Sequence, residues 1–147
     1  MAEIGFYHLT RTTADQALPP LLGRTLAAGQ RAVVLLGSPA RVAALDAALW
    51  ACTEPDWLPH GTPATGDPDM HPIWLTDEDH AANGARFAFL LDNRETAHAD
   101  SFTRIFDLFD GNDEAATAAA RRRWSAARQA GHTLVYWQQG ARGWEKK

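Results

Sequence analysis

The chain has 147 residues and a formal net charge of −4 at neutral pH, with 46% hydrophobic and 22% charged residues. These values are typical of one globular domain and exclude a disordered or collagen-like chain. No apolar run approaches the roughly 18 residues that cross a bilayer. The single cysteine, Cys52, excludes an internal disulfide and a cysteine-rich zinc site. We therefore expect a soluble, cytoplasmic protein made of one domain over residues 1–147.

Short apolar runs separated by turn residues predict seven strands. They cover residues 4–9, 32–36, 57–60, 73–75, 86–91, 103–109 and 133–138. The run at 57–60 contains Pro59, and because proline is tolerated at a sheet edge, we expect this strand at the edge. Residues 61–72 are rich in proline and glycine and predict a loop. Residues 140–147 are expected to form a mobile tail.

The first two predicted helices lie between these strands. One covers residues 14–28 and ends at Gly29, although Pro19 and Pro20 favour a start later than Ala14, because proline fits best in the first turn. The other covers residues 39–51 and is capped by Ser38. Its inward-facing residues are expected to be Val42, Leu45, Ala48 and Leu49.

A third, longer helix precedes the last strand. It runs to Ala130, is stopped by Gly131 and is capped by Asn112 or Asp110. Strands that alternate with helices in this way predict an α/β fold. We expect a single-domain, Rossmann-like three-layer sandwich with a mostly parallel sheet and no nucleotide-binding loop.

The usual catalytic and cofactor motifs are missing from the sequence. Neither G-x-G-x-x-G nor G-x-x-x-x-G-K-[ST] occurs, and the Gly37-Ser38 pair is explained by Ser38 as a helix cap. No G-x-S-x-G or H-E-x-x-H is present. A metal site is conceivable in the segment 71–80, but a solvated acidic loop is the favoured interpretation. We expect no catalytic residue, no metal and no cofactor.

The charge is distributed unevenly along the chain. Residues 1–114 hold seven basic and 17 acidic side chains, for a net charge of −10, whereas residues 115–147 have a net charge of +6. An acidic body with a basic C-terminal quarter indicates a local anion-binding face. A basic helix that balances the protein's own acidic surface is an equally weighted alternative.

The last predicted helix carries a polar and aromatic stripe. Four residues fall within about 60° of one another at the helical period: Thr117, Arg121, Trp124 and Arg128. A second stripe, of alanines, is expected to pack on the sheet, and Arg123, which falls on it, is expected to reach solvent from its edge. A tryptophan between arginines suits a ligand with one apolar group and one carboxylate or phosphate. A tryptophan that only covers a strand end is the alternative.

A second candidate surface centres on two tryptophans. Trp50 and Trp57 lie seven residues apart, and Leu58 and Pro59 extend the apolar patch. Tryptophan is enriched at interface hot spots and is seldom fully buried. Trp57 is the better interface candidate, because Trp50 is also compatible with an ordinary core position at a helix end.

At these residues the chain resembles the chi subunit of bacterial DNA polymerase III holoenzyme, a clamp-loader accessory protein. The resemblance covers nearly the whole chain and depends on several short motifs in order. They are Phe6-Tyr7-His8-Leu9, Gly29-Gln30-Arg31-Ala32-Val33, Leu45-Asp46-Ala47-Ala48-Leu49-Trp50, Trp57-Leu58-Pro59-His60, Asp107-Leu108-Phe109-Asp110-Gly111-Asn112-Asp113, Arg121-x-Arg123-Trp124-x-x-x-Arg128-x-Ala130-Gly131 and Tyr136-Trp137.

The resemblance implies a non-catalytic adaptor between two partners, with DNA contacted only indirectly. One partner is the psi subunit of the clamp loader, in a 1:1 heterodimer, at Trp50, Trp57, Leu58 and Pro59. Whether repair helicases share this surface stays open. The other is the acidic C-terminal tail of single-stranded-DNA-binding protein, which ends in Pro-Phe. The implied tail site comprises Arg121 for the terminal carboxylate, Trp124 as the pocket wall, and Arg128, Thr117, Ser125 and Arg122.

This sequence departs from the family pattern at two positions of the implied tail site. Basic residues that relatives carry are here Thr117 and Ser125, which predicts weaker tail binding unless Arg122 compensates. Two other functions stay open. One is an α/β enzyme that handles nucleotides or phosphate esters, and the other is a direct single-stranded-DNA binder. The charge of −10 on residues 1–114 disfavours direct DNA binding, because it repels a long phosphate chain.

Overall fold

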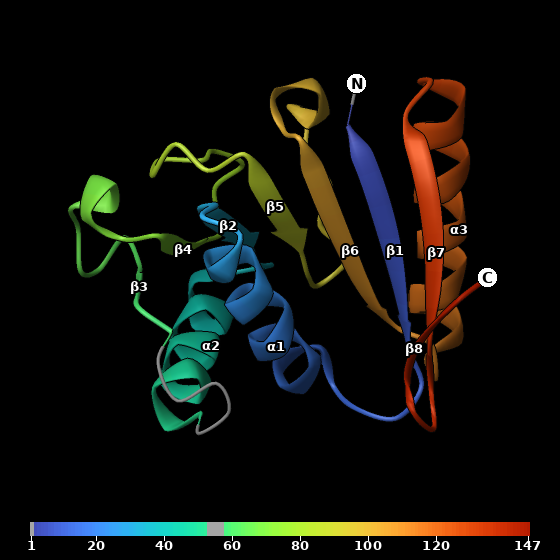
Figure 1. The fold of residues 1–147 in the computed structure, drawn as a ribbon, viewed down its shortest axis with the longest axis horizontal. Helices are drawn as coiled ribbons and strands as arrows, with labels where there is room; N and C mark the ends of the chain where they lie inside the picture. The colour runs from blue at the N-terminus through green and yellow to red at the C-terminus, as the bar shows by residue number, and fades with distance from the viewer. Residues whose placement is uncertain (1, 53–57) are drawn as a thin grey trace.

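The computed structural model describes residues 2–52 and 58–147 and has three layers (Figure 1). The middle layer is an eight-stranded sheet in the order β3-β4-β2-β5-β6-β1-β7-β8. Every strand pairs in parallel with its neighbours except β8, which runs antiparallel to β7. The strands are β1 (Glu3–Leu9), β2 (Ala32–Leu35), β3 (His60–Gly61), β4 (Ile73–Thr76), β5 (Phe87–Leu90), β6 (Arg104–Asp110), β7 (Thr133–Gly140) and β8 (Gly143–Lys146). The predicted α/β sandwich with a mostly parallel sheet is confirmed.

Helices cover both faces of this sheet. On one face α1 (Ala14–Ala27) and α2 (Pro39–Ala51) pack over an apolar cluster that includes Leu22, Leu45 and Phe89. On the other face α3 (Glu114–Gln129) packs over a cluster that includes Phe6 and Ile105. Two short 3₁₀ helices, η1 (Pro68–Met70) and η2 (Ala99–Ser101), lie in connecting loops. None of the helices in the described part of the chain has both the length and the apolar character needed to cross a membrane.

The connections that leave the neighbouring central strands β1 and β6 run in opposite directions and on opposite faces of the sheet. The chain leaves β1 through α1 toward β2 on one face, and it leaves β6 through α3 toward β7 on the other. In open α/β sheets, the carboxyl ends of two adjacent strands whose connections leave on opposite faces form the usual ligand-binding crevice. Here a cavity lined by Leu9 and Asp110 lies at the carboxyl ends of β1 and β6.

The side chain of Gln139, from β7, accepts hydrogen bonds from the backbone N–H groups beside this crevice. Its Oε1 accepts hydrogen bonds from the backbone N–H groups of Thr10, Arg11 and Thr12, at 3.1, 2.9 and 3.1 Å. Its Nε2 donates to Thr12 Oγ1 at 2.7 Å. One glutamine therefore satisfies three successive backbone donors and attaches β7 to the loop that follows β1.

The start of α1 differs from the sequence prediction. The helix begins at Ala14, and Pro19 and Pro20 lie in its interior instead of its first turn. Thr13 and Gln16 form a capping box, in which each side chain accepts from the other residue's backbone N–H, and this fixes the first turn. Pro19 is buried against the core, so apolar contact offsets the backbone hydrogen bonds that the two prolines cannot make.

The cap of α3 also differs from the prediction. Asp113, and not Asn112 or Asp110, is the N-cap, and its Oδ1 accepts from the N–H groups of Ala115 and Ala116. Asp110 closes the preceding turn instead, by accepting from the N–H of Asn112 at 2.9 Å. Asp113 is the one of the three that stands directly before the first helical residue, where its carboxylate reaches the free N–H groups.

Three further segments differ from their predicted form. Ala48 is exposed, because the inner face of α2 is narrower than expected and consists of Val42, Leu45 and Leu49. The predicted edge strand is at the edge, but it is β3, with later bounds than 57–60. Residues 143–146 form β8, where a tail without secondary structure was expected, because the chain turns back and pairs with the free edge of β7.

Candidate functional site

The stripe on α3 faces a pocket formed with three strands. Thr117, Arg121 and Trp124 line it from the helix, as the helical spacing predicts. Across from them lie aromatic side chains from β1, β6 and β7, namely Phe6, Phe109 and Tyr136. The cavity measures about 270 Å³. The helix therefore supplies a cation to a pocket whose walls are mostly aromatic.

Trp124 is the aromatic wall of the pocket on the helix side. Its ring is half-buried and meets two others edge to face, with centroid distances of 5.2 Å to Phe6 and 5.8 Å to Tyr136. Edge-to-face contacts place the positive edge of one ring on the negative face of the next, which fixes the orientation of the indole. Trp124 therefore packs on residues in the middle of β1 and β7, rather than over a strand end, and it lines the pocket.

Tyr136 is a pocket residue that was not predicted as a site residue. Its hydroxyl is hydrogen-bonded to Nδ1 of His8 in β1. Burial raises the pKa of the Tyr136 hydroxyl, and the positive charge of nearby Arg121 partly offsets this effect. The sequence does hold a signal for Tyr136, since alternate residues of the last strand face α3, but only strand pairing shows that β7 lies beside β1.

The other residues of the predicted tail site lie around this pocket or away from it. Arg121 is exposed at the pocket, whereas Arg128 lies one helical turn beyond Trp124 and does not line it. Arg122 and Ser125 are exposed on α3 outside the pocket lining. Among the described residues, Thr117 Oγ1 is the buried side-chain polar atom without a hydrogen-bond partner. Arg121 is thus the arginine best placed to meet a ligand in the cavity.

Arg123 does not reach solvent, contrary to the prediction. Its Nε and Nη2 donate to the two carboxylate oxygens of Asp107 in β6, at 2.7 and 2.9 Å. Both side chains are buried, at 8% and 2% exposure. Burial raises the pKa of the Asp107 carboxyl, and the hydrogen bonds from Arg123 act in the opposite direction. Arg123 lies on the alanine stripe because it has a buried partner, which the helical pattern does not reveal.

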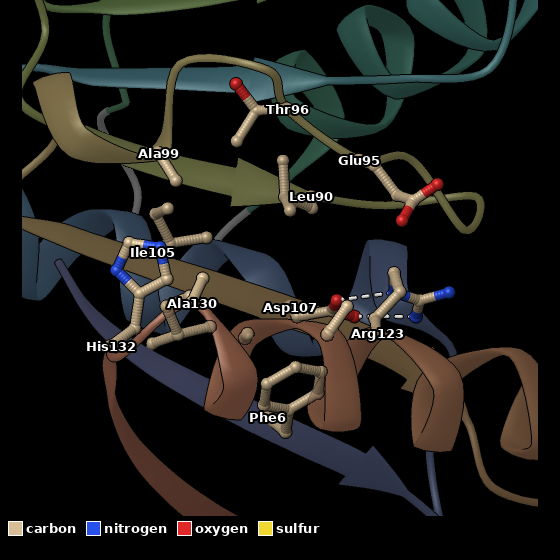
Figure 2. Close-up of a pocket in the computed structure, with 13 residues that line it drawn as sticks. Phe6, Leu90, Glu95, Thr96, Ala99, Ile105, Asp107, Arg123, Ala130 and His132 are labelled. Atoms are coloured by element: carbon tan, nitrogen blue, oxygen red, sulfur yellow. Dashed lines mark hydrogen bonds and ion pairs between the residues drawn. The ribbon is translucent and has the colours of Figure 1, made fainter. Parts of the chain in front are cut away.

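A second pocket lies on the other flank of α3, as Figure 2 shows. It measures about 150 Å³ and has an apolar floor that includes Leu90 and Ile105. The Asp107–Arg123 ion pair lies toward one end and His132 toward the other, where Nδ1 of His132 accepts the backbone N–H of Ala2 at 3.2 Å. The ion pair and the His132 contact are internal to the protein, so these groups serve the fold.

The second candidate surface, made of Trp50, Trp57, Leu58 and Pro59, is called the Trp50 patch below. Trp50 lies at the C-terminal end of α2. Trp50 is 60% exposed, and its ring centroid is 4.6 Å from that of His60. The two ring nitrogens of His60 lie 2.7 Å from the carbonyl oxygen of Leu58 and 2.9 Å from Oδ1 of Asp46. The buried imidazole of His60, which is hydrogen-bonded at both ring nitrogens, therefore supports the exposed indole of Trp50.

The other predicted residues of this patch have different environments. Leu58 is only 5% exposed and belongs to the apolar core, so its side chain supports the patch from below and offers no contact surface. Pro59 is partly exposed. Trp57 lies outside the described residues. Trp50 and Pro59 are therefore the accessible members in the described part of the patch.

The acidic loop after β4 forms ordinary internal contacts. Asp79 accepts hydrogen bonds from the hydroxyl of Thr96 and the backbone N–H of Ala97, at 2.7 and 2.8 Å. Within the described ranges, no three His, Cys, Asp or Glu side chains are grouped so that they could share a metal ion. The candidate site with the most developed geometry is thus the aromatic pocket beside Arg121.

Comparison of the sequence with known protein families assigns the chain to one of them. Residues 1–135 match the family described as DNA polymerase III chi subunit, HolC. The match includes β1, β6 and all of α3, and it ends just before Tyr136. A comparison with individual curated proteins gives no match. Since the family covers most of its length, the chain belongs to the DNA polymerase III chi subunit family, which consists of accessory subunits of a replicative polymerase.

Proposed function

We propose that this protein is a non-catalytic replication adaptor that links the clamp loader to single-stranded-DNA-binding protein. The observation that carries the proposal is the aromatic pocket on α3 with Arg121 at its side. A pocket of this kind fits a peptide that ends in an aromatic residue, because the ring and the terminal carboxylate belong to the same residue. The acidic C-terminal tail of single-stranded-DNA-binding protein, ending in Pro-Phe, has this chemistry.

Each part of the pocket has a role toward such a tail. The Arg121 guanidinium donates two parallel hydrogen bonds to the terminal carboxylate. The phenylalanine ring enters the cavity lined by Trp124, Phe6 and Phe109, where edge-to-face packing adds to the burial of apolar area. The net charge of +6 on residues 115–147 attracts the acidic residues that precede the tail's end.

The Trp50 patch is the proposed surface for the psi subunit, in a 1:1 complex. An exposed tryptophan held by a buried histidine is a suitable anchor, because rigid aromatic side chains lose little conformational entropy on binding. Pro59 extends this surface, whereas Leu58 acts through the core. The patch is carried by α2, on the opposite face of the sheet from α3, so the two proposed partners do not compete for space.

The crevice between β1 and β6 supports the adaptor over a nucleotide- or phosphate-handling enzyme. In doubly wound enzymes, backbone N–H groups at this position commonly hold phosphate oxygens. Here three of them already bind Gln139 Oε1. The charge of −10 on residues 1–114 likewise favours a short peptide over a long phosphate chain. We place the protein in the cytoplasm, with the replication machinery.

The test is fluorescence anisotropy with a labelled acidic peptide that ends in Pro-Phe. We expect Arg121→Ala to weaken binding by about 10- to 150-fold, because a charged, bidentate contact is lost. Arg24→Ala, which removes an equal charge from exposed α1, is the control and should bind like the wild type. A peptide without its last phenylalanine should bind weakly to every variant. Equal binding of the full and shortened peptides would show that α3 is only a basic surface.

A further inference from the structure

The C-terminal strand adds a charged face beside the aromatic pocket. The backbone N–H of Lys147 donates to the carbonyl oxygen of Tyr136 at 2.8 Å, directly after the ladder contact between Lys146 and Trp137. Lys147 therefore stands opposite Tyr136, the pocket residue on β7. In an antiparallel pair, residues directly opposite each other project from the same face of the sheet.

The packing of the neighbouring residues shows which face this is. Tyr136 packs with the apolar cluster under α3, whereas Trp137 and Trp144 pack with the cluster under α1 and α2. Because side chains alternate along a strand, Lys147 and Glu145 lie on the α3 face, and Lys146 lies on the opposite face with Trp137. Lys147 is thus on the same face of the sheet as the pocket. It lies directly across the β7–β8 pair from Tyr136, which lines the pocket.

We propose that Lys147 is part of the binding site for the acidic peptide and contacts the carboxylates that precede the peptide's terminal phenylalanine. This inference rests on the proposed function. Arg121 receives the terminal carboxylate, and the chain of the peptide then leaves the pocket past Tyr136 and β8. Lys147 supplies a cation on that path, where α3 itself has the uncharged residues Thr117 and Ser125.

In the absence of the peptide, Glu145 forms an ion pair with Lys147. Its Oε2 lies 3.6 Å from Nζ of Lys147, and the two side chains are 58% and 50% exposed. An ion pair this exposed is weak, so an incoming carboxylate can replace Glu145 at the ammonium group. Glu145 also repels an acidic peptide, since it lies on the same face. The two residues therefore act in opposite directions on affinity.

The experiment compares single-charge variants of the whole chain by anisotropy, with the labelled acidic peptide at low salt. We expect Lys147→Gln to weaken binding about two- to fivefold and Glu145→Gln to strengthen it about twofold, which is the range for one exposed charge. Lys146→Gln is the matched control, because it removes the same charge from the neighbouring residue on the opposite face. It should change affinity by much less than Lys147→Gln. The difference should shrink at high salt.

The outcomes separate this inference from the proposed function. If Lys147→Gln and Lys146→Gln have the same effect while Arg121→Ala abolishes binding, the role of Lys147 is wrong and the pocket remains the peptide site. If Arg121→Ala also binds like the wild type, both the pocket function and the role of Lys147 are overturned. Thermal melting checks that each variant is folded; the Lys147→Gln backbone keeps its N–H for Tyr136, so we expect an unchanged Tm.

Discussion

Arg123 in α3 binds both carboxylate oxygens of Asp107 in β6, and this buried ion pair joins the pocket helix to the middle of the sheet. A third contact, from Arg123 Nη1 to Asn93 Oδ1 at 3.2 Å, extends it to the loop after β5. Arg121 and Trp124 stand two residues before and one residue after Arg123. By fixing the rotation of α3 about its axis, the pair directs both residues toward the aromatic pocket.

Arg123→Ala should lower the free energy of unfolding by about 3–5 kcal/mol, because it leaves the Asp107 carboxylate buried without a partner. Arg122→Ala is the matched control, since its exposed side chain should contribute within about 0.5 kcal/mol. Urea denaturation measures both. Equal midpoints for the two variants would contradict a buried role for Arg123.

Gln139→Ala should destabilise the protein by about 1–3 kcal/mol, because three backbone N–H groups lose their acceptor together. Gln138→Ala, whose side chain lies on the other face of β7, should have a smaller effect. Hydrogen exchange at Thr10, Arg11 and Thr12 gives the local measurement. We expect faster exchange there in Gln139→Ala only, and unchanged protection would show that these hydrogen bonds do not hold the loop.

The chain has only two tyrosines, Tyr7 and Tyr136, and burial raises the pKa of both hydroxyls above the usual 10.0. The native protein therefore keeps protons that the unfolded chain has lost. It follows that the free energy of unfolding falls as the pH rises through and above 10. Ultraviolet titration of tyrosinate should show a later transition in native than in urea-unfolded protein. Tyr7→Phe isolates Tyr136, and superimposed native and unfolded curves would refute the prediction.

Trp50→Ala should weaken association with a psi subunit by about 30-fold or more, since truncation of a hot spot typically costs about 2 kcal/mol. The same change should alter Tm little, because Trp50 is 60% exposed. Met70→Ala, at an exposed apolar residue in η1, is the control and should leave association unchanged. Calorimetry with purified psi subunit measures the effect. A large loss of Tm in Trp50→Ala would instead identify Trp50 as a structural residue.

Several features of this protein follow from the sequence because their physical cause is local. Ser38 caps α2 and Gly131 ends α3 through contacts within a few residues. The positions of Thr117, Arg121 and Trp124 on one face of α3 follow from the helical period alone. The N-cap of α3 was predicted wrongly because three possible capping residues, Asp110, Asn112 and Asp113, lie close together in the sequence. Each of these side chains can accept a hydrogen bond from a nearby backbone N–H, so the sequence alone does not show which one caps the helix.

Other features depend on contacts between distant parts of the chain, and only the tertiary structure decided them. Phe6, Phe109 and Tyr136 form one pocket because strand order places β1 between β6 and β7. Arg123 is buried because Asp107, sixteen residues earlier, offers it a bidentate partner inside the protein. Lys147 reaches the pocket face because the final residues pair with β7. Helical and strand periods fix the direction of a side chain within its own element, whereas its neighbours are fixed by how the elements pack, which local patterns do not contain.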